Sequence, residues 1–339
     1  MVELMIQHGR AECERESVNH QQAWAVVLAG GDGTRLSAFT RSIAGDDRPK
    51  QFCRLYGDRT LLAQTRARLT PAISPERTLF SVVKHHERFY AEELADVKPS
   101  RMVVQPSNKG TTAAIICSLL RITRLAGDPI VGFFPTDHHY SRETRFIAAV
   151  RLALRVVSSR LETIVLLGAD AEHPEVEYGW IEPGTSLECP LTNSLVSVRR
   201  FWEKPSTQVA QALLADGCLW NTFVMIGRAS AFLDILNTSV PGLMRAMGRD
   251  RGPFDADSYL ADRDEAYAAL GPGDFSRQVL SVSTGQLAVL RLGDVGWSDL
   301  GTPERVMSAI TRSGLRSHWL GSGQTESVGD LAKTPASQA

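Results

Sequence analysis

Several familiar signatures are missing from this 339-residue sequence. No stretch approaches 18 uninterrupted apolar residues, so a transmembrane helix is not expected. The N-terminal residues are polar and rich in acidic side chains, unlike a signal peptide, which favours a cytoplasmic location. The chain has five cysteines, and no two of them form a Cys-x-x-Cys pair. Free thiols in a reducing compartment are therefore expected in place of disulfides or a zinc site.

An excess of charge of one sign is also absent. Lys plus Arg number 37 and Asp plus Glu number 38, which gives a net charge of −1. Nucleic acid and acidic membranes are therefore not expected as partners of the whole surface. With 43% hydrophobic and 22% charged residues, the composition is that of an ordinary globular protein. Its length suffices for one large α/β domain or two smaller domains.

Three glycines follow an apolar run near the N-terminus. The run Ala25-Val26-Val27-Leu28 is typical of a buried strand, and Gly30, Gly31 and Gly33 come just after it. The spacing is not the G-x-G-x-x-G of a dinucleotide-binding turn, and no Gly-Lys-Ser/Thr completes a P-loop. Glycines at such a turn permit φ > 0, and successive backbone N–H groups there can bind an anion.

Two cations accompany these glycines. Arg35 offers a forked donor suited to phosphate oxygens, and Lys50 offers a second, more mobile charge. The sequence thus indicates a loop that wraps a polyphosphate, although a plain strand-to-helix turn with surface cations explains these residues equally well. We predict a long loop over residues 30–60, a length that is usually functional or disordered.

Strand and helix patterns alternate along the first half of the chain. This alternation predicts an α/β fold with three layers, in which helices cover both faces of a mostly parallel, mixed sheet. Ligands of such a sheet bind at the carboxyl ends of its strands. The predicted strands cover residues 24–29, 78–83, 102–104, 129–134 and 163–168, and the predicted helices cover 61–69, 86–96, 113–125 and 142–157.

The pattern changes after Asp170, where shorter strands are predicted at 177–181, 194–202 and 219–227, with a helix at 206–215. We expect these strands to form a lid that extends or faces the first sheet. Residues 229–270 are predicted as mainly helical, 286–292 as a strand, and a last helix begins at Pro303. The predicted organisation is a flexible extension (1–21), one domain with a nucleotide half (about 22–170) and a lid half (about 171–315), and a disordered tail (316–339).

Two aspartates stand where predicted strands end. Asp137 follows Val131-Gly132-Phe133-Phe134-Pro135-Thr136, and Asp299 follows Gly296-Trp297-Ser298. Mg²⁺ takes oxygen ligands, commonly one or two carboxylates together with substrate phosphates. The two residues are therefore candidate metal ligands, and a turn or helix cap is the alternative for each.

A polar loop, Gln105-Pro106-Ser107-Asn108-Lys109-Gly110-Thr111-Thr112, precedes a buried helix. The amide of Gln105 pairs a donor with an acceptor, as the edge of a nucleotide base requires, and Gly110 would let a base lie against the backbone. A helix-capping loop without a ligand is the alternative.

These motifs together resemble those of the sugar-1-phosphate nucleotidyltransferases. The resemblance rests on the glycine loop Leu28–Leu36 and on Pro49-Lys50-Gln51-Phe52, Phe134-Pro135-Thr136-Asp137-His138, Glu177-Tyr178-Gly179-Trp180-Ile181, Phe201-Trp202-Glu203-Lys204-Pro205 and Val295–Thr302. Its nearest branch is that of the mannose-1-phosphate guanylyltransferases. It implies a GT-A-like fold and transfer of a nucleotidyl group from an NTP to a hexose 1-phosphate, with GTP and mannose 1-phosphate as the first choice.

The resemblance also implies roles for single residues. It implies catalytic roles for Arg35, which would hold the leaving pyrophosphate, and Lys50, and Mg²⁺ coordination by Asp137 and Asp299. It assigns nucleotide binding to Leu28, Gly30, Gly31, Gly33, Thr34, Gln105, Gly110 and Thr111. It assigns sugar phosphate binding to Gly179, Glu203, Lys204 and Asn221.

The sequence departs from the guanylyltransferase pattern in places. Gln105-Pro106 is reminiscent of thymidylyl- and uridylyltransferases, and Asp274–Leu280 replaces a segment typical of guanylyltransferases. Asn221 is followed by Thr222-Phe223 where Ser-Gly is usual. A thymidylyl- or uridylyltransferase for glucose 1-phosphate, or a catalytically weak sugar-nucleotide sensor that regulates a partner, are therefore the alternatives. A homo-oligomer is left open.

Overall fold

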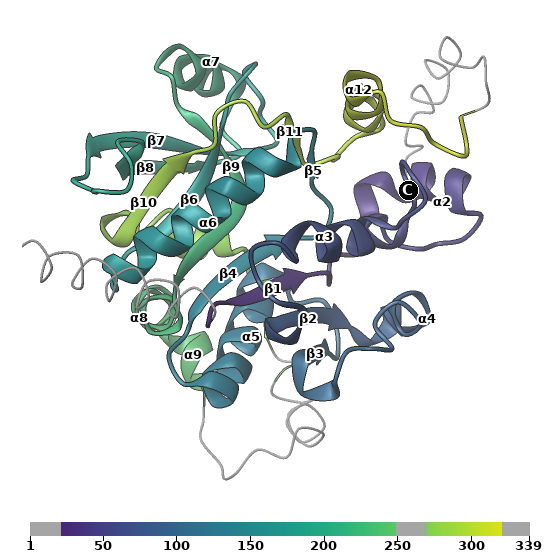
Figure 1. Cartoon of the computed structure of the whole chain (residues 1–339), viewed down its shortest axis with the longest axis horizontal. Coiled ribbons are helices and arrows are strands. Elements are labelled where there is room, and N and C mark those ends of the chain that lie inside the picture. Colours follow the sequence, from purple (N-terminus) through teal and green to yellow (C-terminus); the bar gives the residue numbers. More distant parts are fainter. Residues whose placement is uncertain (1–21, 249–266, 268–269, 321–339) are drawn as a thin grey trace, which may run out of the picture.

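A nine-stranded mixed sheet runs through the protein, with helices on both of its faces (Figure 1). The computed structural model describes residues 22–248, 267 and 270–320. The strand order is β3-β2-β1-β4-β9-β6-β10-β8-β7. The strands are β1 (Trp24–Leu28), β2 (Thr78–Val83), β3 (Met102–Gln105), β4 (Ile130–Pro135), β6 (Ile164–Asp170), β7 (Gly179–Ser186), β8 (Leu195–Glu203), β9 (Leu219–Arg228) and β10 (Leu287–Arg291).

The first four strands confirm the predicted parallel arrangement. β1 pairs in parallel with both β2 and β4, and β2 pairs in parallel with β3. The lid strands extend this sheet, and one of them enters its centre. β9 lies antiparallel between β4 and β6, so that strands of the predicted lid half and nucleotide half share one sheet. β10 then continues the sheet in parallel with β6.

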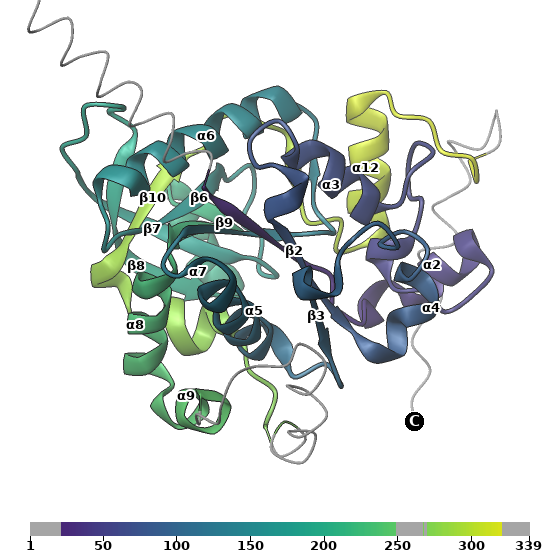
Figure 2. The same ribbon diagram turned by 60° about the horizontal axis from the view of Figure 1, so that its bottom comes forward.

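Two groups of helices sandwich the sheet (Figure 2). α3 (Leu61–Leu69) and α6 (Glu143–Ser159) lie on one side, whereas α5 (Gly110–Ala126), α8 (Ala229–Ser239) and α9 (Pro241–Gly248) lie on the other. α7 (Thr207–Ala215) is the predicted connection between β8 and β9. Ser206 accepts a hydrogen bond from Val209 N and so caps α7, and Thr60 caps α3 in the same way through Ala63 N.

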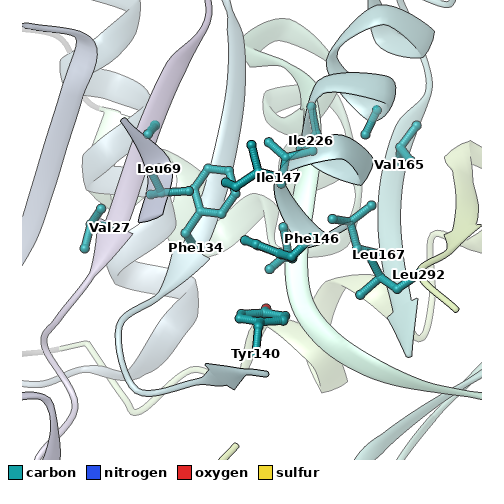
Figure 3. Packing of buried hydrophobic residues seen from close by; sticks show 14 of the residues in the cluster. Val27, Leu69, Phe134, Tyr140, Phe146, Ile147, Val165, Leu167, Ile226 and Leu292 are labelled. Carbon is teal, nitrogen blue, oxygen red and sulfur yellow. The ribbon is translucent and has the colours of Figure 1, made fainter. Parts of the chain in front are cut away.

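The alternation of side chains along β1 divides the interior into two cores. Ala25 and Val27 face the core below α3 and α6, whereas Val26 faces the core shared with α5 and α8. Figure 3 shows the first core, where Phe146 of α6 stacks on Tyr140 with ring centroids 3.8 Å apart. Each such large apolar side chain contributes roughly 1.5–3 kcal/mol when fully buried. Packing in the two cores thereby fixes the strands whose carboxyl ends carry the loops of the site.

The predicted long loop over residues 30–60 is wrong in part, because it contains a helix. α2 (Ser37–Ala44) forms there and ends at Gly45, whose φ is 78°. The turn that follows is closed by Arg48, whose Nε and Nη2 atoms each lie 2.8 Å from a carboxylate oxygen of Asp46. The helix predicted over 86–96 is also shorter in the structure, where α4 spans Glu87–Tyr90.

A third apolar cluster joins α2 to the last helix, α12 (Pro303–Ser313). The chain beyond α12 continues this contact, since Trp319 meets Phe39 edge to face at 5.5 Å and donates a hydrogen bond from Nε1 to the Leu55 carbonyl. The predicted disordered tail is therefore wrong for residues 316–320. The remainder of that tail and the predicted extension 1–21 lie outside the described residues, as does most of the predicted helical stretch between 249 and 269.

Two sequence-based expectations concern the whole chain. Cys53, Cys117, Cys189 and Cys218 are free thiols, as predicted, and Cys13 lies outside the described ranges. Within those ranges, no helix is both long and apolar enough to cross a membrane.

Candidate active site

A cavity of about 400 Å³ opens at the carboxyl ends of β1 and β4 and is bounded by the lid strands β7, β8 and β9. It brings together residues that the sequence places more than 250 positions apart. The predicted site residues that line it are Leu28, Gly30, Gly31, Arg35, Gln105, Gly110, Thr111, Asp137, Gly179, Glu203, Lys204, Asn221 and Asp299. The predicted residues Gly33, Thr34 and Lys50 do not line it, although Lys50 contacts two of the residues in its wall.

A two-stranded sheet holds the two aspartates at one end of this cavity. β5 (His139–Tyr140) pairs antiparallel with β11 (Trp297–Ser298), and Ser298 lies opposite His139. Asp137 stands two residues before His139, and Asp299 directly follows Ser298. Two carboxylates from distant parts of the chain are therefore fixed at the same end of one short ladder.

Lys50 connects these two aspartate turns. Its Nζ atom lies 2.9 Å from Asp137 Oδ2 and donates hydrogen bonds to the carbonyl oxygens of Asp299 (2.6 Å) and Leu300 (3.2 Å). The three donors of the ammonium group are thus directed at three acceptors. The side chain is 7% exposed, so these contacts form largely out of water.

One oxygen of Asp299 collects three donors. Asp299 Oδ1 accepts hydrogen bonds from the Tyr178 hydroxyl (3.0 Å), the Gly301 amide (2.8 Å) and Arg305 Nη1 (2.9 Å). Arg305 also reaches Glu175 Oε2 at 2.5 Å, and its guanidinium lies over the Tyr178 ring. Because these contacts converge on Oδ1, they fix the orientation of the carboxylate.

The surrounding cations keep both carboxylates ionised. Burial alone would raise the pKa of Asp137, but the nearby Lys50 ammonium outweighs it and the pKa is lowered. Burial likewise opposes ionisation of Asp299, and the Arg305 and Lys50 charges outweigh it, so this pKa is also lowered. Two anionic carboxylates in one cavity could hold a divalent cation.

His138 lies beside Asp137 in the same wall. Its Nδ1 atom accepts a hydrogen bond from Trp297 Nε1 (3.2 Å), which leaves Nε2 to carry the ring proton, 3.9 Å from Asp137 Oδ1. Burial lowers the pKa of His138, so the ring is neutral near pH 7. His138 and Trp297 therefore cross-link the two aspartate segments a second time.

The glycine loop packs on the segment that carries Lys50. Gly33 has a φ of 62°, and a Cβ atom there would lie 3.1 Å from the Lys50 amide nitrogen. Only glycine meets both demands at low cost. Gln51 holds the loop in place by donating hydrogen bonds from Nε2 to the carbonyl oxygens of Ala29 (3.0 Å) and Gly31 (2.7 Å). Gly33 thus contributes to loop packing and lies outside the cavity wall.

Arg35 spans the mouth of the cavity. Its Nη1 atom lies 2.8 Å from Glu177 Oε2, and both side chains are about half exposed. Glu177 belongs to the segment that leads into β7, so this ion pair links the glycine loop to the lid. The predicted phosphate-binding cation is therefore paired with a carboxylate that a phosphate could replace.

The polar loop before α5 is held by the protein itself. The buried amide of Gln105 donates from Nε2 to Ser81 Oγ (3.1 Å) and accepts at Oε1 from the Tyr267 hydroxyl (2.8 Å). Gly110 has a φ of 83°, and a Cβ atom there would lie 2.2 Å from the Gly273 carbonyl oxygen. The side of Gly110 that lacks a side chain thus faces Gly273 and not the cavity, although other atoms of Gly110 line it.

The lid side of the cavity carries the predicted sugar-phosphate residues. Gly179 lies opposite Glu203 in the β7–β8 ladder, and a Cβ atom at Gly179 would lie 2.9 Å from Glu203 Oε2. Burial and the nearby Asp274 raise the pKa of Glu203 to about 7, against the opposing charge of Lys204. Asn221 accepts a hydrogen bond at Oδ1 from the Phe223 amide, which leaves its NH₂ group to donate elsewhere.

Within the part of the chain that the structure describes, three residues other than glycine have positive φ, and all belong to this region. Lys204 (49°) and Phe223 (58°) line the cavity, and Leu300 (49°) follows Asp299. Such conformations cost about 1–3 kcal/mol each and are concentrated at functional sites. The strain supports the assignment of the cavity as the functional centre.

Several contributors to the site were not among the predicted residues, among them Gln51, His138, Glu177, Tyr178, Trp297 and Arg305. All of these except Arg305 lie inside the motifs that carry the family resemblance, so closeness to a predicted residue was the available signal. Arg305 has no such signal, because its contact with Asp299 depends on how α12 begins.

A profile described as Nucleotidyl transferase matches residues 24–313. The match spans the sheet, the cavity and α12, and the chain therefore belongs to the nucleotidyl transferase family.

Several relatives share most of this length. The Xanthan biosynthesis protein XanB of Xanthomonas campestris pv. campestris is 31% identical over 294 residues, which cover 85% of this chain and 60% of the relative. The mannose-1-phosphate guanylyltransferase ManC of Salmonella typhimurium is 30% identical, over 82% of this chain and 58% of its own. The chain thus spans about three fifths of the length of these curated relatives.

Solved structures share the fold. A Thermus thermophilus structure described as a mannose-1-phosphate geranyltransferase is 25% identical, with a TM-score of 0.71 over 86% of this chain and 79% of that one. A Helicobacter pylori structure described as a mannose-6-phosphate isomerase is 20% identical, with a TM-score of 0.62 over 82% of this chain and 99% of that one. The second likeness concerns the fold alone.

Proposed function

We propose that this protein transfers a nucleotidyl group from an NTP to a hexose 1-phosphate, releasing pyrophosphate and forming an NDP-hexose. The observation that carries the proposal is the convergence of Asp137 and Asp299. A two-stranded ladder and Lys50 hold them together in a cavity that also contains the glycine loop and the Glu203-Lys204 pair. Two anionic centres and several cations at one cavity suit a reaction between two phosphorylated substrates.

The donor set in the cavity fits a divalent cation. Nucleotidyl transferases of this family generally use such an ion, and we infer Mg²⁺ because both candidate ligands are carboxylates. Asp137 and the Oδ2 atom of Asp299 would hold it, since the Tyr178, Gly301 and Arg305 donors occupy Oδ1. When bound, Mg²⁺ would offset negative charge on the phosphates.

The glycine-loop side would receive the triphosphate. Amides near Gly30 and Gly31 would bind phosphate oxygens, and Arg35 would exchange its Glu177 partner for the β- and γ-phosphates. An oxygen of the sugar phosphate would attack the α-phosphorus in line, and pyrophosphate would leave on the Arg35 side. Lys50 would keep Asp137 in place and add positive charge near the transition state. Catalysis of this kind consists mainly of positioning and charge stabilisation.

The lid side would receive the hexose 1-phosphate. Lys204 would neutralise its phosphate, and Glu203 and Asn221 would bind sugar hydroxyls. Glu203 can donate or accept a hydrogen bond near neutral pH, because its pKa lies near 7. The positive φ of Lys204 would set the direction of its side chain into the cavity.

GTP and mannose 1-phosphate are the preferred substrates. Support comes from relatives that carry the name mannose-1-phosphate guanylyltransferase. A thymidylyl- or uridylyltransferase for glucose 1-phosphate is the second candidate, because Gln105-Pro106 departs from the guanylyl pattern. In the structure Gln105 already bonds to Ser81 and Tyr267, which limits its freedom to recognise any base.

A pyrophosphate-release assay with Mg²⁺ tests this proposal. Each of GTP, ATP, CTP, UTP and dTTP is paired with mannose 1-phosphate and with glucose 1-phosphate. We expect the largest kcat/KM for GTP with mannose 1-phosphate. A larger value for dTTP or UTP with glucose 1-phosphate would establish the second candidate, and no turnover with any pair would overturn the enzyme function in favour of a sugar-nucleotide sensor.

A further inference from the structure

A second group of potential metal ligands lies beside the cavity and takes no part in the proposed reaction. It consists of Asp32, from the glycine loop, and of His85 and His86, from the turn after β2. One ligand atom from each residue lies within 4.8 Å of the others. Among the residues that the structure describes, no other cluster of three or more His, Cys, Asp or Glu side chains meets this spacing.

The distances within the group match those of a tetrahedral metal centre. Asp32 Oδ1 lies 3.1 Å from His85 Nε2 and 3.3 Å from His86 Nε2. Zinc bonds to nitrogen and oxygen are about 2.0–2.2 Å long, so two ligands at tetrahedral angles are ~3.3 Å apart. Asp32 therefore already stands from each imidazole at the separation expected around one ion, and the two imidazole nitrogens lie within 4.8 Å of each other.

Neighbouring residues orient two of the three ligands, Asp32 and His86. Asn108 Nδ2 donates to Asp32 Oδ2 at 2.9 Å, which directs Oδ1 towards the imidazoles. The His86 side chain is 4% exposed and packs beside the Phe52 ring, with centroids 5.9 Å apart. Its Nδ1 atom is buried without a hydrogen-bond partner among the described residues, so its polar contacts are made through Nε2. Asp32 and His86 are thus positioned by neighbouring residues before any ion arrives.

We propose that Asp32, His85 and His86 bind one divalent transition-metal ion of the Zn²⁺ type, with the remaining coordination position open to solvent. Imidazole nitrogen is a preferred ligand of Zn²⁺ and its neighbours in the periodic table, whereas Mg²⁺ prefers oxygen. This site therefore differs in chemistry from the carboxylate pair Asp137 and Asp299. The open position follows from exposure, because the side chains of His85 and Asp32 are 55% and 39% exposed.

A bound ion would tie the glycine loop to the segment that follows β2. It would also change the charge of that loop, where Asp32 places an anion between Gly31 and Gly33. If the loop receives a triphosphate, as proposed above, the ion would replace a repulsive charge by an attractive one. The metal site itself does not depend on that function, because its ligands stand outside the cavity wall.

Binding of Co²⁺, a spectroscopic substitute for Zn²⁺, tests this inference. Full-length protein without an affinity tag is stripped with a chelator, titrated with CoCl₂ alone and followed by visible absorption. We expect one equivalent of Co²⁺ to give the intense d–d bands of a four-coordinate centre, and ZnCl₂ to remove them. Asp32→Asn and His85→Gln should each weaken binding at least about tenfold, since each removes one of only three ligands.

Two control variants separate this site from other sources of binding. His173→Gln removes a histidine outside the cluster, and Asp137→Asn removes a carboxylate of the main cavity. Both should keep the four-coordinate Co²⁺ spectrum. The inference is overturned if the wild-type protein gives no such spectrum, or if the spectrum persists in the Asp32→Asn/His85→Gln double variant. Neither readout requires enzyme activity, so failure of the proposed function would leave this test intact.

Discussion

The Lys50 ammonium group lies 2.9 Å from Asp137 Oδ2 and, through the Asp299 and Leu300 carbonyls, also holds the second aspartate turn. One side chain therefore joins three segments: the short helix Lys50–Phe52, the turn after β4 and the segment before α12. This contact explains how residues 50, 137 and 299 form one centre.

The first prediction concerns Lys50. Lys50→Met keeps the length of the side chain but leaves Asp137 and two carbonyls without their donor, so the free energy of unfolding should fall by about 1–3 kcal/mol. Urea unfolding measures this change. Lys98→Met, at an exposed lysine, is the control and should change stability by less than about 0.5 kcal/mol. Equal losses of unfolding free energy in the two variants would show that the Lys50 contacts stabilise the protein no more than an exposed lysine does.

The second prediction concerns the ion pair at the mouth of the cavity. Glu177→Gln removes the charge that Arg35 must leave before it can bind a phosphate. An exposed pair is worth at most about 1 kcal/mol, so the KM for the NTP should fall by up to about fivefold. Initial rates at varied NTP concentration measure it, with Arg35→Met expected to raise the same KM. A rise of KM in Glu177→Gln would instead assign Glu177 to substrate binding.

The third prediction concerns pH and Glu203. Its pKa is about 7 in the folded protein, above the ordinary 4.5 of the unfolded chain. Because the folded state holds this proton more tightly, the contribution of Glu203 to stability is greatest below pH 4.5 and is lost as pH rises through 7. Glu203→Gln should therefore raise the free energy of unfolding by about 1–3 kcal/mol at pH 8, and by less at pH 5.

Denaturant unfolding at the two pH values measures this difference. The exposed Glu188 provides the control, since Glu188→Gln should show no such pH dependence. A stabilisation by Glu203→Gln that is equal at pH 5 and pH 8 would be inconsistent with a raised pKa.

The fourth prediction concerns Arg305, which positions Asp299. Its guanidinium is mostly buried between Asp299 and Glu175, so Arg305→Met should remove the cation that these two carboxylates share and destabilise the protein by about 3–5 kcal/mol. Arg305→Lys keeps the charge but not the forked geometry, and should raise the Mg²⁺ concentration needed for half-maximal rate.

The same helix supplies a matched control for Arg305. Arg312 pairs with Glu172 at the surface, where its side chain is 69% exposed. Arg312→Met should alter neither stability nor Mg²⁺ requirement appreciably. An unchanged Mg²⁺ requirement in Arg305→Lys would mean that Asp299 does not depend on Arg305 for its orientation.

Local sequence patterns were enough to predict most of the framework. The apolar runs before Gly30 and Asp137 end in turns at the same edge of the sheet, because parallel strands present their carboxyl ends together. The bounds of the strands 24–28 and 78–83 and of the helix 61–69 were also predicted almost to the residue. Their side chains alternate or repeat with the period of the element that they form.

Other features depend on pairing between distant segments, which local patterns do not encode. β9 has the same apolar character as an edge or a central strand, so its antiparallel position between β4 and β6 could not be predicted. The packing of Trp319 on Phe39 likewise depends on the direction in which the chain leaves α12. Gly110 was interpreted as a contact for a base, whereas its open side meets Gly273, 163 residues further along.

The proposed roles of the site residues stay predictions until activity is measured. Asp137 has the most important proposed role in catalysis, because it is both a proposed metal ligand and the partner of Lys50. Its replacement by asparagine preserves the shape of the side chain and removes its charge.

The most direct measurement is therefore pyrophosphate release by Asp137→Asn with GTP, mannose 1-phosphate and saturating Mg²⁺, beside the wild type and Asp58→Asn, a change at an exposed aspartate. We expect kcat/KM to fall by about 10³-fold or more in Asp137→Asn, while Asp58→Asn keeps the wild-type rate. A folded Asp137→Asn variant that turns over at the wild-type rate would contradict the assignment of this cavity as a metal-dependent nucleotidyl transfer site.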